Sequence, residues 1–256
     1  MLLMVVAVTL AACGSRESQQ RTGDQQARQH IPEQPVQDKV HNEAQNPAQT
    51  EDTRPIIAAF GDSLSAGFGV EPGKSFPDDV QRLLDAAGYR YRVVNLGVSG
   101  DTTTDGVERL PTVLAIHPAV VILEFGGNDG LRGLPVTSTQ KNLAEMVESL
   151  RKSGAKILLA GMTLPRNYGP EYIQSFEQVY VGLARQYKLA RIPFLLEGVG
   201  GHPDLMQPDG IHPTAEGAHI VAHNVMKYLQ PLLADDPGKG KIKTSSVLPV
   251  LVVPAY

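Results

Sequence analysis

The sequence predicts an α/β fold in which a parallel sheet of about five strands lies between two layers of helices. Five short apolar runs rich in β-branched residues are spaced along the chain, and segments with helical periodicity separate them. Polar, glycine-bearing loops follow several of these runs. Strand and helix in alternation favour right-handed crossovers and hence a parallel sheet covered by helices on both faces. The pattern extends over about 180 residues, the size of one domain.

The five predicted strands cover residues 56–60, 91–96, 119–125, 155–161 and 192–196. The predicted helices cover residues 76–87, 139–150, 171–187 and 214–229. In the first of these helices Val80, Leu83 and Leu84 recur at helical spacing, and Gly88 stands where a helix C-cap is expected. We found no internal repeats.

Composition excludes several classes of protein. The chain has 256 residues, of which 42% are hydrophobic and 20% charged, enough apolar side chains for a full core. Its formal net charge of −4 and its lack of a Lys/Arg cluster exclude nucleic acid as the expected partner. No run of about 20 apolar residues predicts a membrane-spanning helix. We expect a monomer.

The N-terminal residues differ from the rest of the chain. Residues 1–13 have the apolar pattern of a signal peptide, and residues 14–53 are polar and predict a disordered linker. The Leu-Ala-Ala-Cys sequence that ends at Cys13 resembles the lipobox of bacterial lipoproteins. This resemblance implies a lipid attached to Cys13 and tethering to a membrane. The alternative is a simple secretory signal in which Cys13 is incidental.

The predicted folded domain spans residues 54–234 and contains no cysteine, because Cys13 is the only cysteine in the chain. Disulfides, thiolate metal sites and a cysteine nucleophile are therefore excluded from this domain. Residues 235–256 form a C-terminal tail that ends in ten largely apolar residues with two prolines. This tail is too short to span a membrane, and its sequence indicates no role.

The first polar loop indicates a nucleophile. The apolar run 56–59 stops abruptly at Gly61, Asp62 and Ser63, as a buried strand does when it ends in a tight turn. This turn presents the Ser63 hydroxyl at the carboxyl edge of the sheet, where α/β folds place their chemistry. Ser63 is therefore the candidate nucleophile. Taken alone, the same three residues also fit an ordinary turn or a helix N-cap.

Three later loops supply the groups that a serine nucleophile needs. His212 is the candidate base, and Asp209, three residues earlier, can accept from its other ring nitrogen. The backbone N–H groups of Ser63 and Gly97 and the side-chain amide of Asn128 are candidate oxyanion donors. Together these groups support nucleophilic acyl transfer, with activity rising with pH as the imidazole loses its proton.

Four segments resemble the four sequence blocks of the SGNH, or GDSL, hydrolase family: residues 61–63, Gly97 in its loop, residues 126–129 and residues 209–213. The resemblance implies an SGNH-type, flavodoxin-like α/β/α fold. It assigns the nucleophile to Ser63, the oxyanion donors to Gly97 and Asn128, and the base and its partner to His212 and Asp209. It implies no cofactor and no metal.

Residues 126–133 and 164–169 are similar to one subgroup, the Gram-negative periplasmic thioesterases, arylesterases and lysophospholipases. This similarity implies hydrolysis of aryl esters, short to medium acyl esters or thioesters, or lysophospholipids. It also implies export to the periplasm or cell envelope. Two alternatives stay open: an esterase acting on O-acetylated polysaccharide, and a non-catalytic envelope lipoprotein that serves as a binding module.

Competing motifs fit poorly. The nucleophile elbow of α/β-hydrolases requires Gly-x-Ser-x-Gly, but Ser65 occupies the last position here. In that fold the acid and the base lie on separate loops, whereas Asp209 and His212 are three residues apart. The Gly67-Phe68-Gly69 sequence lacks the third glycine of a dinucleotide site and the Lys-Ser/Thr of a P-loop.

Other polar residues have simpler interpretations. Asp62 and Asp129 lie in loops where a carboxylate usually bonds backbone N–H groups, although Asp62 is also a candidate substrate-binding residue beside Ser63. Arg132 is a second candidate substrate-binding residue, against the alternative of a solvent-facing arginine. We interpret His202, His219 and His223 as solvated residues and not metal ligands. His117, before Pro118, predicts a helix end.

Overall fold

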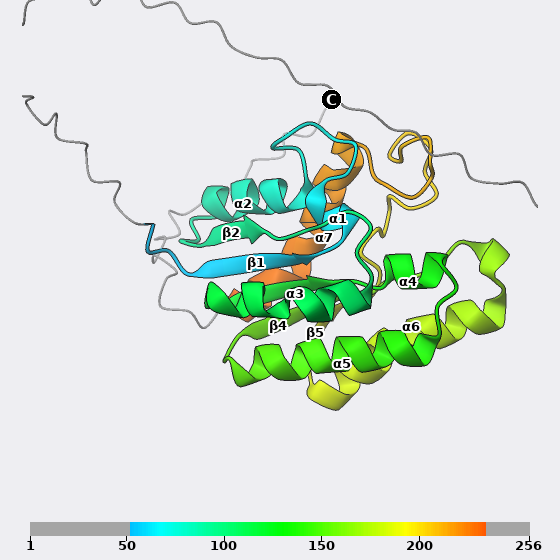
Figure 1. Ribbon diagram of the computed structural model, residues 1–256. Coiled ribbons are helices and arrows are strands. Elements are labelled where there is room, and N and C mark those ends of the chain that lie inside the picture. Colours follow the sequence, from blue (N-terminus) through cyan, green and yellow to red (C-terminus); the bar gives the residue numbers. More distant parts are fainter. Residues whose placement is uncertain (1–51, 234–256) are drawn as a thin grey trace, which may run out of the picture. The chain divides into compact units, whose positions relative to one another are not determined.

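A five-stranded parallel sheet forms the centre of the computed structural model, which describes residues 52–233 (Figure 1). The strands are β1 (Ile56–Gly61), β2 (Arg92–Asn95), β3 (Val120–Glu124), β4 (Lys156–Ala160) and β5 (Ala190–Ile192). Their order in the sheet is β2-β1-β3-β4-β5, and every neighbouring pair is parallel. The predicted parallel α/β fold is confirmed. The predictions for residues 1–13, for nearly all of the linker and for the C-terminal tail lie outside the described residues.

Helices cover both faces of the sheet. They are α1 (Ser63–Ala66), α2 (Phe76–Ala86), α3 (Thr103–Ala115), α4 (Gly127–Leu131), α5 (Val136–Lys152), the 3-10 helix η1 (Arg166–Tyr168), α6 (Pro170–Tyr187) and α7 (Ala215–Leu233). Helix α2 packs against α7, whereas α5 packs against both α3 and α6 (Figure 1). Right-handed crossovers explain why α2 and α7 form one group and α3, α5 and α6 another. The order of the strands reverses between β1 and β3, so later crossovers place their helices on the other face. Among the described helices, none is long and apolar enough to cross a membrane.

The helix α2 shows how local sequence defines an element. Ser75 and Asp78 form a capping box in which the Asp78 carboxylate accepts from the Ser75 N–H at 3.0 Å. At the other end, Gly88 has a φ of 75°, a left-handed conformation that glycine adopts without strain. The predicted bounds of this helix, 76–87, are therefore correct to within one residue.

The helix α3 was not predicted, because Gly106 and Pro111 interrupt its sequence pattern. Packing explains the glycine: a Cβ atom at Gly106 would lie 3.0 Å from the sulfur of Met146 and 3.1 Å from the ring of Phe125. Gly106 thus lets α3 approach α5 and the end of β3 closely. Tertiary contacts outweigh the low helix propensity of this segment.

The fifth strand differs from its prediction of residues 192–196. It covers Ala190–Ile192, and Pro193 follows directly. Proline has no N–H to donate to a neighbouring strand, so it ends the regular ladder. The Leu195 N–H still bonds the Gly161 carbonyl at 2.9 Å, which keeps the chain beside β4 while it turns away.

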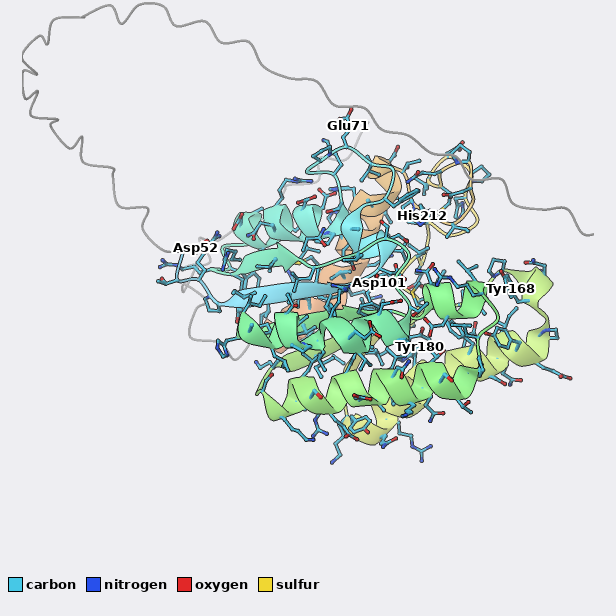
Figure 2. All side chains as sticks on the ribbon, viewed as in Figure 1. Asp52, Glu71, Asp101, Tyr168, Tyr180 and His212 are labelled. Atoms are coloured by element: carbon cyan, nitrogen blue, oxygen red, sulfur yellow. The ribbon has the colours of Figure 1, made fainter. Side chains whose placement is uncertain are left out.

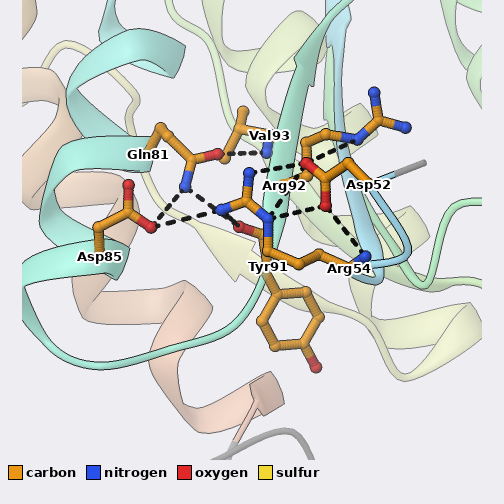
Figure 3. Close-up of polar contacts among 7 residues, drawn as sticks. All are labelled: Asp52, Arg54, Gln81, Asp85, Tyr91, Arg92 and Val93. Atoms are coloured by element: carbon orange, nitrogen blue, oxygen red, sulfur yellow. Dashed lines mark hydrogen bonds and ion pairs between the residues drawn. The ribbon is translucent and has the colours of Figure 1, made fainter. Parts of the chain in front are cut away.

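A polar cluster holds the beginning of the folded chain (Figure 3). The guanidinium of Arg54 bonds the Asp52 carboxylate and the Tyr91 carbonyl, the latter at 3.2 Å. Gln81 donates to the same carbonyl and accepts from the Val93 N–H at 2.7 Å. These bonds join the start of β1 to α2 and β2. They lie at the opposite end of the sheet from His212, as the labels Asp52 and His212 show in Figure 2.

Candidate active site

Ser63 lies in a tight turn from β1 into α1. Asp62 caps this short helix, since its Oδ1 atom accepts from the Leu64 N–H at 3.1 Å. A Cβ atom at Gly61 would lie 2.3 Å from both the Glu124 carboxyl and the Ser65 hydroxyl, so only glycine fits there. The turn lies at the carboxyl end of β1, beside β3, where the order of the strands reverses. Open α/β sheets bind their ligands at this point.

Ser63, His212 and Asp209 form one hydrogen-bonded chain, as predicted. The Oγ atom of Ser63 lies 2.8 Å from Nε2 of His212, although the two residues are 149 positions apart. On the other side of the ring, Nδ1 lies 2.7 Å from Oδ2 of Asp209. Figure 2 shows His212 at the same edge of the sheet as Asp101, beyond the ends of the strands. This is the geometry of a nucleophile, a base and an orienting carboxylate.

Asp209 is held as a carboxylate. Its Oδ1 atom accepts from the N–H groups of Ile211 and His212, at 2.9 and 3.0 Å. Partial burial acts to raise its pKa, but the hydrogen bonds from the His212 side chain, the His212 N–H and the Ile211 N–H together lower it to about 2. An ionised Asp209 requires the proton on Nδ1 of His212, which leaves the Nε2 lone pair facing Ser63.

Two further contacts hold the loop that carries His212. The ring of Phe68 packs on the imidazole, with centroids 4.6 Å apart. The Gln207 amide donates to the Phe68 carbonyl at 2.7 Å and to the Pro213 carbonyl at 2.8 Å. Gln207 therefore ties the loop before α7 to the segment after α1. A side chain at Gly69 would collide with Gln207, since its Cβ would lie 2.1 Å from Oε1.

The three predicted oxyanion donors differ in their placement. Ser63 offers its N–H beside its own hydroxyl, and no described residue accepts from this group. Asn128 lines the same cleft, and its Nδ2 atom donates to the Asp101 carbonyl at 2.9 Å and to Oδ2 of Asp62 at 3.3 Å. The Gly97 N–H donates instead to Oδ1 of Asn95, at 2.9 Å.

Packing also explains why residue 97 is glycine. A Cβ atom there would lie 2.2 Å from the backbone nitrogen of Ala66, so α1 leaves no room for a side chain. Gly97 is not among the residues that line the cleft. The structure thus brings Ser63 and Asn128 together at the cleft. Gly97 lies outside the lining of the cleft and leaves room for α1 to pack closely.

The sequence pattern did not reveal a buried carboxyl group beside Ser63. Glu124 ends β3 and is fully buried, and its Oε2 atom accepts from the Asp62 N–H, the Ser65 N–H and the Ser65 hydroxyl. Burial and then the charge of Asp62 raise the pKa of Glu124 well above its usual value. The signal in the sequence is a single acidic residue in the apolar run 119–125, where unpaired charges are rare.

Asp129 has the structural role predicted for it. Its carboxylate accepts from the Thr103 N–H at 2.8 Å and from the Thr103 and Thr139 hydroxyls. It therefore joins α3, α4 and α5. Asp62 also accepts a backbone N–H as predicted, and it lines the cleft in addition.

A largely apolar cleft of about 480 Å³ opens beside Ser63. Its apolar side chains are Leu64, Leu131, Met162, Leu164, Pro165, Phe194, Leu196, Met206 and Ile211. This volume falls within the range of small-molecule sites. Such a cleft accommodates an apolar chain attached to a group held near Ser63.

The prediction for Arg132 needs correction. Arg132 does not line the cleft, and its guanidinium donates to the Gly100 carbonyl at 2.8 Å. The arginine that does line the cleft is Arg166, in η1. Arg132 follows Asn128 closely in sequence, but α4 directs its side chain toward the loop after β2.

His219 and His223 are neighbours on α7. Nε2 of His219 lies 3.3 Å from Nε2 of His223, and its Nδ1 lies 3.3 Å from the Asp79 carboxylate. In residues 52–233, no group of three or more His, Cys, Asp or Glu side chains is arranged to hold a metal ion. His117 has a φ of 48° and follows the end of α3, in agreement with the predicted helix end.

Comparisons with known proteins identify the family of this chain. The model of the GDSL-like Lipase/Acylhydrolase family matches residues 59–220. The chain is 49% identical to Esterase TesA of Pseudomonas aeruginosa over 178 residues, which is 69% of this chain and 89% of the relative. It is 38% identical to the Thioesterase 1/protease 1/lysophospholipase L1 of Escherichia coli over 181 residues, or 70% of this chain and 86% of the relative.

A solved structure is similar as well. The crystal structure of AlinE4, an SGNH-hydrolase family esterase, is similar with a TM-score of 0.59 at 40% identity, covering 70% of this chain and 97% of that one. The fold, the four sequence blocks and these comparisons therefore assign this chain to the GDSL-like lipase/acylhydrolase family, as a serine esterase of the SGNH type.

Proposed function

We propose that Ser63 is the nucleophile of this esterase, His212 its general base and Asp209 the residue that orients the base. The observation that carries the proposal is the position of His212, whose two ring nitrogens contact Ser63 Oγ at 2.8 Å and Asp209 Oδ2 at 2.7 Å. A serine hydroxyl is a weak nucleophile until a neighbouring base accepts its proton. Only a base with a free Nε2 lone pair can do so, and Asp209 enforces this tautomer.

In the acylation step, Oγ of Ser63 bonds to the carbonyl carbon of the ester or thioester while its proton moves to Nε2 of His212. The bond to the leaving group then breaks, and His212 donates that proton to the leaving oxygen or sulfur. In deacylation, His212 takes a proton from water, and the resulting hydroxyl attacks the acyl group on Ser63. The Ser63 oxygen leaves with the proton from His212, and a carboxylic acid is released.

The negative charge on the former carbonyl oxygen is stabilised by the Ser63 N–H and the Asn128 amide. The Asp101 carbonyl accepts from Nδ2 of Asn128 at 2.9 Å and Oδ2 of Asp62 accepts from it at 3.3 Å, so the hydrogen in the longer bond is the one that an oxyanion shares. The Gly97 N–H contributes as a third donor only when it leaves Asn95.

The substrates we propose are aryl esters, short to medium acyl esters or thioesters, and lysophospholipids. The support is the apolar lining of the cleft and the thioesterase and lysophospholipase activities that the name of the Escherichia coli relative gives. An apolar cleft suits an acyl chain better than the polar rings of an O-acetylated polysaccharide. Arg166 in the lining offers a cation to an anionic leaving group.

We also propose where the protein is located in the cell. The apolar residues 1–12 ahead of Cys13 and the polar linker support export to the bacterial cell envelope, with a lipid on Cys13. Labelling of cells with radioactive palmitate tests the anchor: the protein is expected to take up label, and Cys13→Ala is expected to take up none. A labelled Cys13→Ala variant would disprove the anchor.

Hydrolysis of para-nitrophenyl acetate, butyrate and octanoate tests the chemistry. Ser63→Ala is expected to lower kcat by about four orders of magnitude or more, because the nucleophile is absent. Mass spectrometry of the quenched reaction is expected to find the acyl group on the wild-type protein and none on Ser63→Ala. A folded Ser63→Ala variant with wild-type turnover would refute the assignment.

A further inference from the structure

The fully buried carboxyl group of Glu124 lies at the centre of the site but takes no part in the steps above. Glu124 is the last residue of β3 and pairs in register with Gly61, the last residue of β1. Its carboxyl group fills the space that a side chain at Gly61 would occupy. It therefore lies directly beneath the turn that carries Ser63.

The two oxygens of Glu124 have different surroundings. Oε2 accepts three hydrogen bonds, from the Asp62 N–H at 3.1 Å, the Ser65 N–H at 3.2 Å and the Ser65 hydroxyl at 2.8 Å. Oε1 is equally buried, and no donor among the described residues is directed at it. A buried oxygen without a donor is costly when it carries charge, but it is satisfied when it bears a proton and donates.

An acceptor for that proton is adjacent. The side chains of Glu124 and Asp62 are within hydrogen-bonding contact of each other. Two carboxyl groups that share a hydrogen bond in a buried site cannot both be ionised, so one of them keeps a proton. Asp62 accepts from the Leu64 N–H and from Nδ2 of Asn128, which uses both of its oxygens as acceptors. The proton consequently belongs on Glu124.

We propose that Glu124 is a neutral carboxylic acid that donates its Oε1 proton to the Asp62 carboxylate and thereby positions Asn128 for the proposed reaction. A carboxylate can only accept, so an ionised Asp62 fixes which end of the Asn128 amide faces Ser63. Glu124 is a positioning residue in this scheme, since it acts through Asp62 and touches no substrate. The catalytic part of the inference rests on the proposed function.

The surrounding charges agree with a neutral Glu124. In residues 52–233 no cation pairs with it: the guanidinium of Arg109 is directed at the Asp101 carboxylate and at the Gly61 and Leu96 carbonyls. Burial, followed by the charge of Asp62, raises the pKa of Glu124 well above its usual value. Burial likewise raises the pKa of Asp62, so that ionising both carboxyl groups at once is unfavourable.

The proton can be detected directly. A protonated carboxyl group gives a C=O stretch in the infrared spectrum that neither a carboxylate nor an amide shares. The wild-type protein at pH 7 is expected to show this band, and Glu124→Gln is expected to lack it. Glu148→Gln is the matched control, because Glu148 accepts from the Tyr187 hydroxyl on the exposed side of α5. It should keep the band.

Kinetics test the positioning role. Glutamine offers one oxygen to accept the three donors and an N–H₂ group to donate to Asp62, whereas methionine fills the space without either. We therefore expect Glu124→Met to lower kcat on para-nitrophenyl butyrate by about 100-fold with KM little changed, because Asn128 is misplaced. Glu124→Gln should restore kcat to within about tenfold of the wild-type value.

The opposite results overturn the proposal. A wild-type spectrum without the acid band, or a band that persists in Glu124→Gln, would mean that Glu124 is not the protonated group. If folded Glu124→Gln is as slow as Glu124→Met, the neutral acid does not position the site. The infrared result needs neither a folded Glu124→Met variant nor an active enzyme, so it decides the protonation state even if Ser63 proves not to be the nucleophile.

Discussion

The two halves of the hydrogen-bonded chain Ser63–His212–Asp209 are held in different ways. The Ser63 side is buried, since Asp62, Ser63 and Ser65 are at most 8% exposed and Glu124 is fully buried. The His212 side lies on a surface turn, where the side chain of Asp209 is 36% exposed and that of His212 is 15% exposed. The first half depends on contacts between residues about 60 positions apart, and the second on a turn of four residues.

This difference indicates where each half is sensitive to mutation. In the exposed turn, the contact between Asp209 Oδ2 and His212 Nδ1 sets the tautomer of His212. Substitutions there should therefore change the rate of the reaction without changing the fold. The residues of the buried half both position Ser63 and stabilise the fold, because their polar groups have no access to water.

Asp209→Asn tests the exposed half. The amide presents an N–H to Nδ1 of His212, which favours the tautomer whose proton lies on Nε2 and faces Ser63. We expect kcat to fall by about 10³- to 10⁴-fold while the melting temperature changes little. Steady-state kinetics on para-nitrophenyl butyrate measure the loss. Asp204→Asn, in the exposed segment before this turn, is the control and should behave as wild type. A loss of under tenfold in Asp209→Asn would mean that His212 needs no carboxylate.

Asn128→Ala tests the oxyanion donor that both halves of the site share. Removing one such donor costs about 10²- to 10³-fold in kcat, and KM should stay near its wild-type value. Asn224→Ala is a matched control, because this amide donates to the Glu197 carbonyl far from Ser63 in the sequence. The assignment fails if Asn128→Ala mainly raises KM, since that result would indicate a binding role in the ground state.

The buried half predicts a dependence of stability on pH. The pKa of Glu124 is raised by burial and by the charge of Asp62, so its folded state keeps a proton that the unfolded chain loses above its usual pKa of 4.5. The associated stability is complete below that value and declines as pH rises toward the raised pKa. The free energy of unfolding of the wild type, minus that of Glu124→Gln, should therefore fall by up to about 1.4 kcal/mol for each unit by which the pH rises.

Urea denaturation of both proteins between about pH 5 and 7 measures this slope. The Glu148→Gln variant should run parallel to the wild type, because Glu148 is not buried within the site. Parallel curves for wild type and Glu124→Gln would instead show that folding takes up no proton at Glu124.

Phe68→Ala should have the smallest effect. Its ring packs on His212 with centroids 4.6 Å apart, yet the residue is 49% exposed. An aromatic contact of this kind contributes about 0.5 to 1.5 kcal/mol, which corresponds to about a 2- to 10-fold loss in kcat/KM. Phe68→Tyr should restore activity. Val181→Ala, a similarly exposed apolar residue on α6, should leave kcat/KM unchanged.

Local patterns were enough to find much of the site. The run that ends at Ser63 and the Asp209–His212 spacing are short-range signals, because strand ends and tight turns are decided within a few residues. The capping box of Ser75 and the glycine at position 88, which mark the two ends of α2, are also short-range signals. Helix α3 was missed for the opposite reason, since its Gly106 is explained only by its contact with Met146 and Phe125.

By itself, the sequence determined the alternation of strands and helices, the positions of Ser63, Asp209 and His212, and the four blocks that resemble the SGNH hydrolases. Only the tertiary structure decided that Glu124 lies beneath the turn that carries Ser63, that Gly97 leaves room for α1 while its N–H bonds Asn95, and that Arg166 lines the cleft in place of Arg132. The physical reason is distance along the chain. A buried carboxyl group or an open cleft is defined by partners from several elements, and no local pattern specifies which of them will meet.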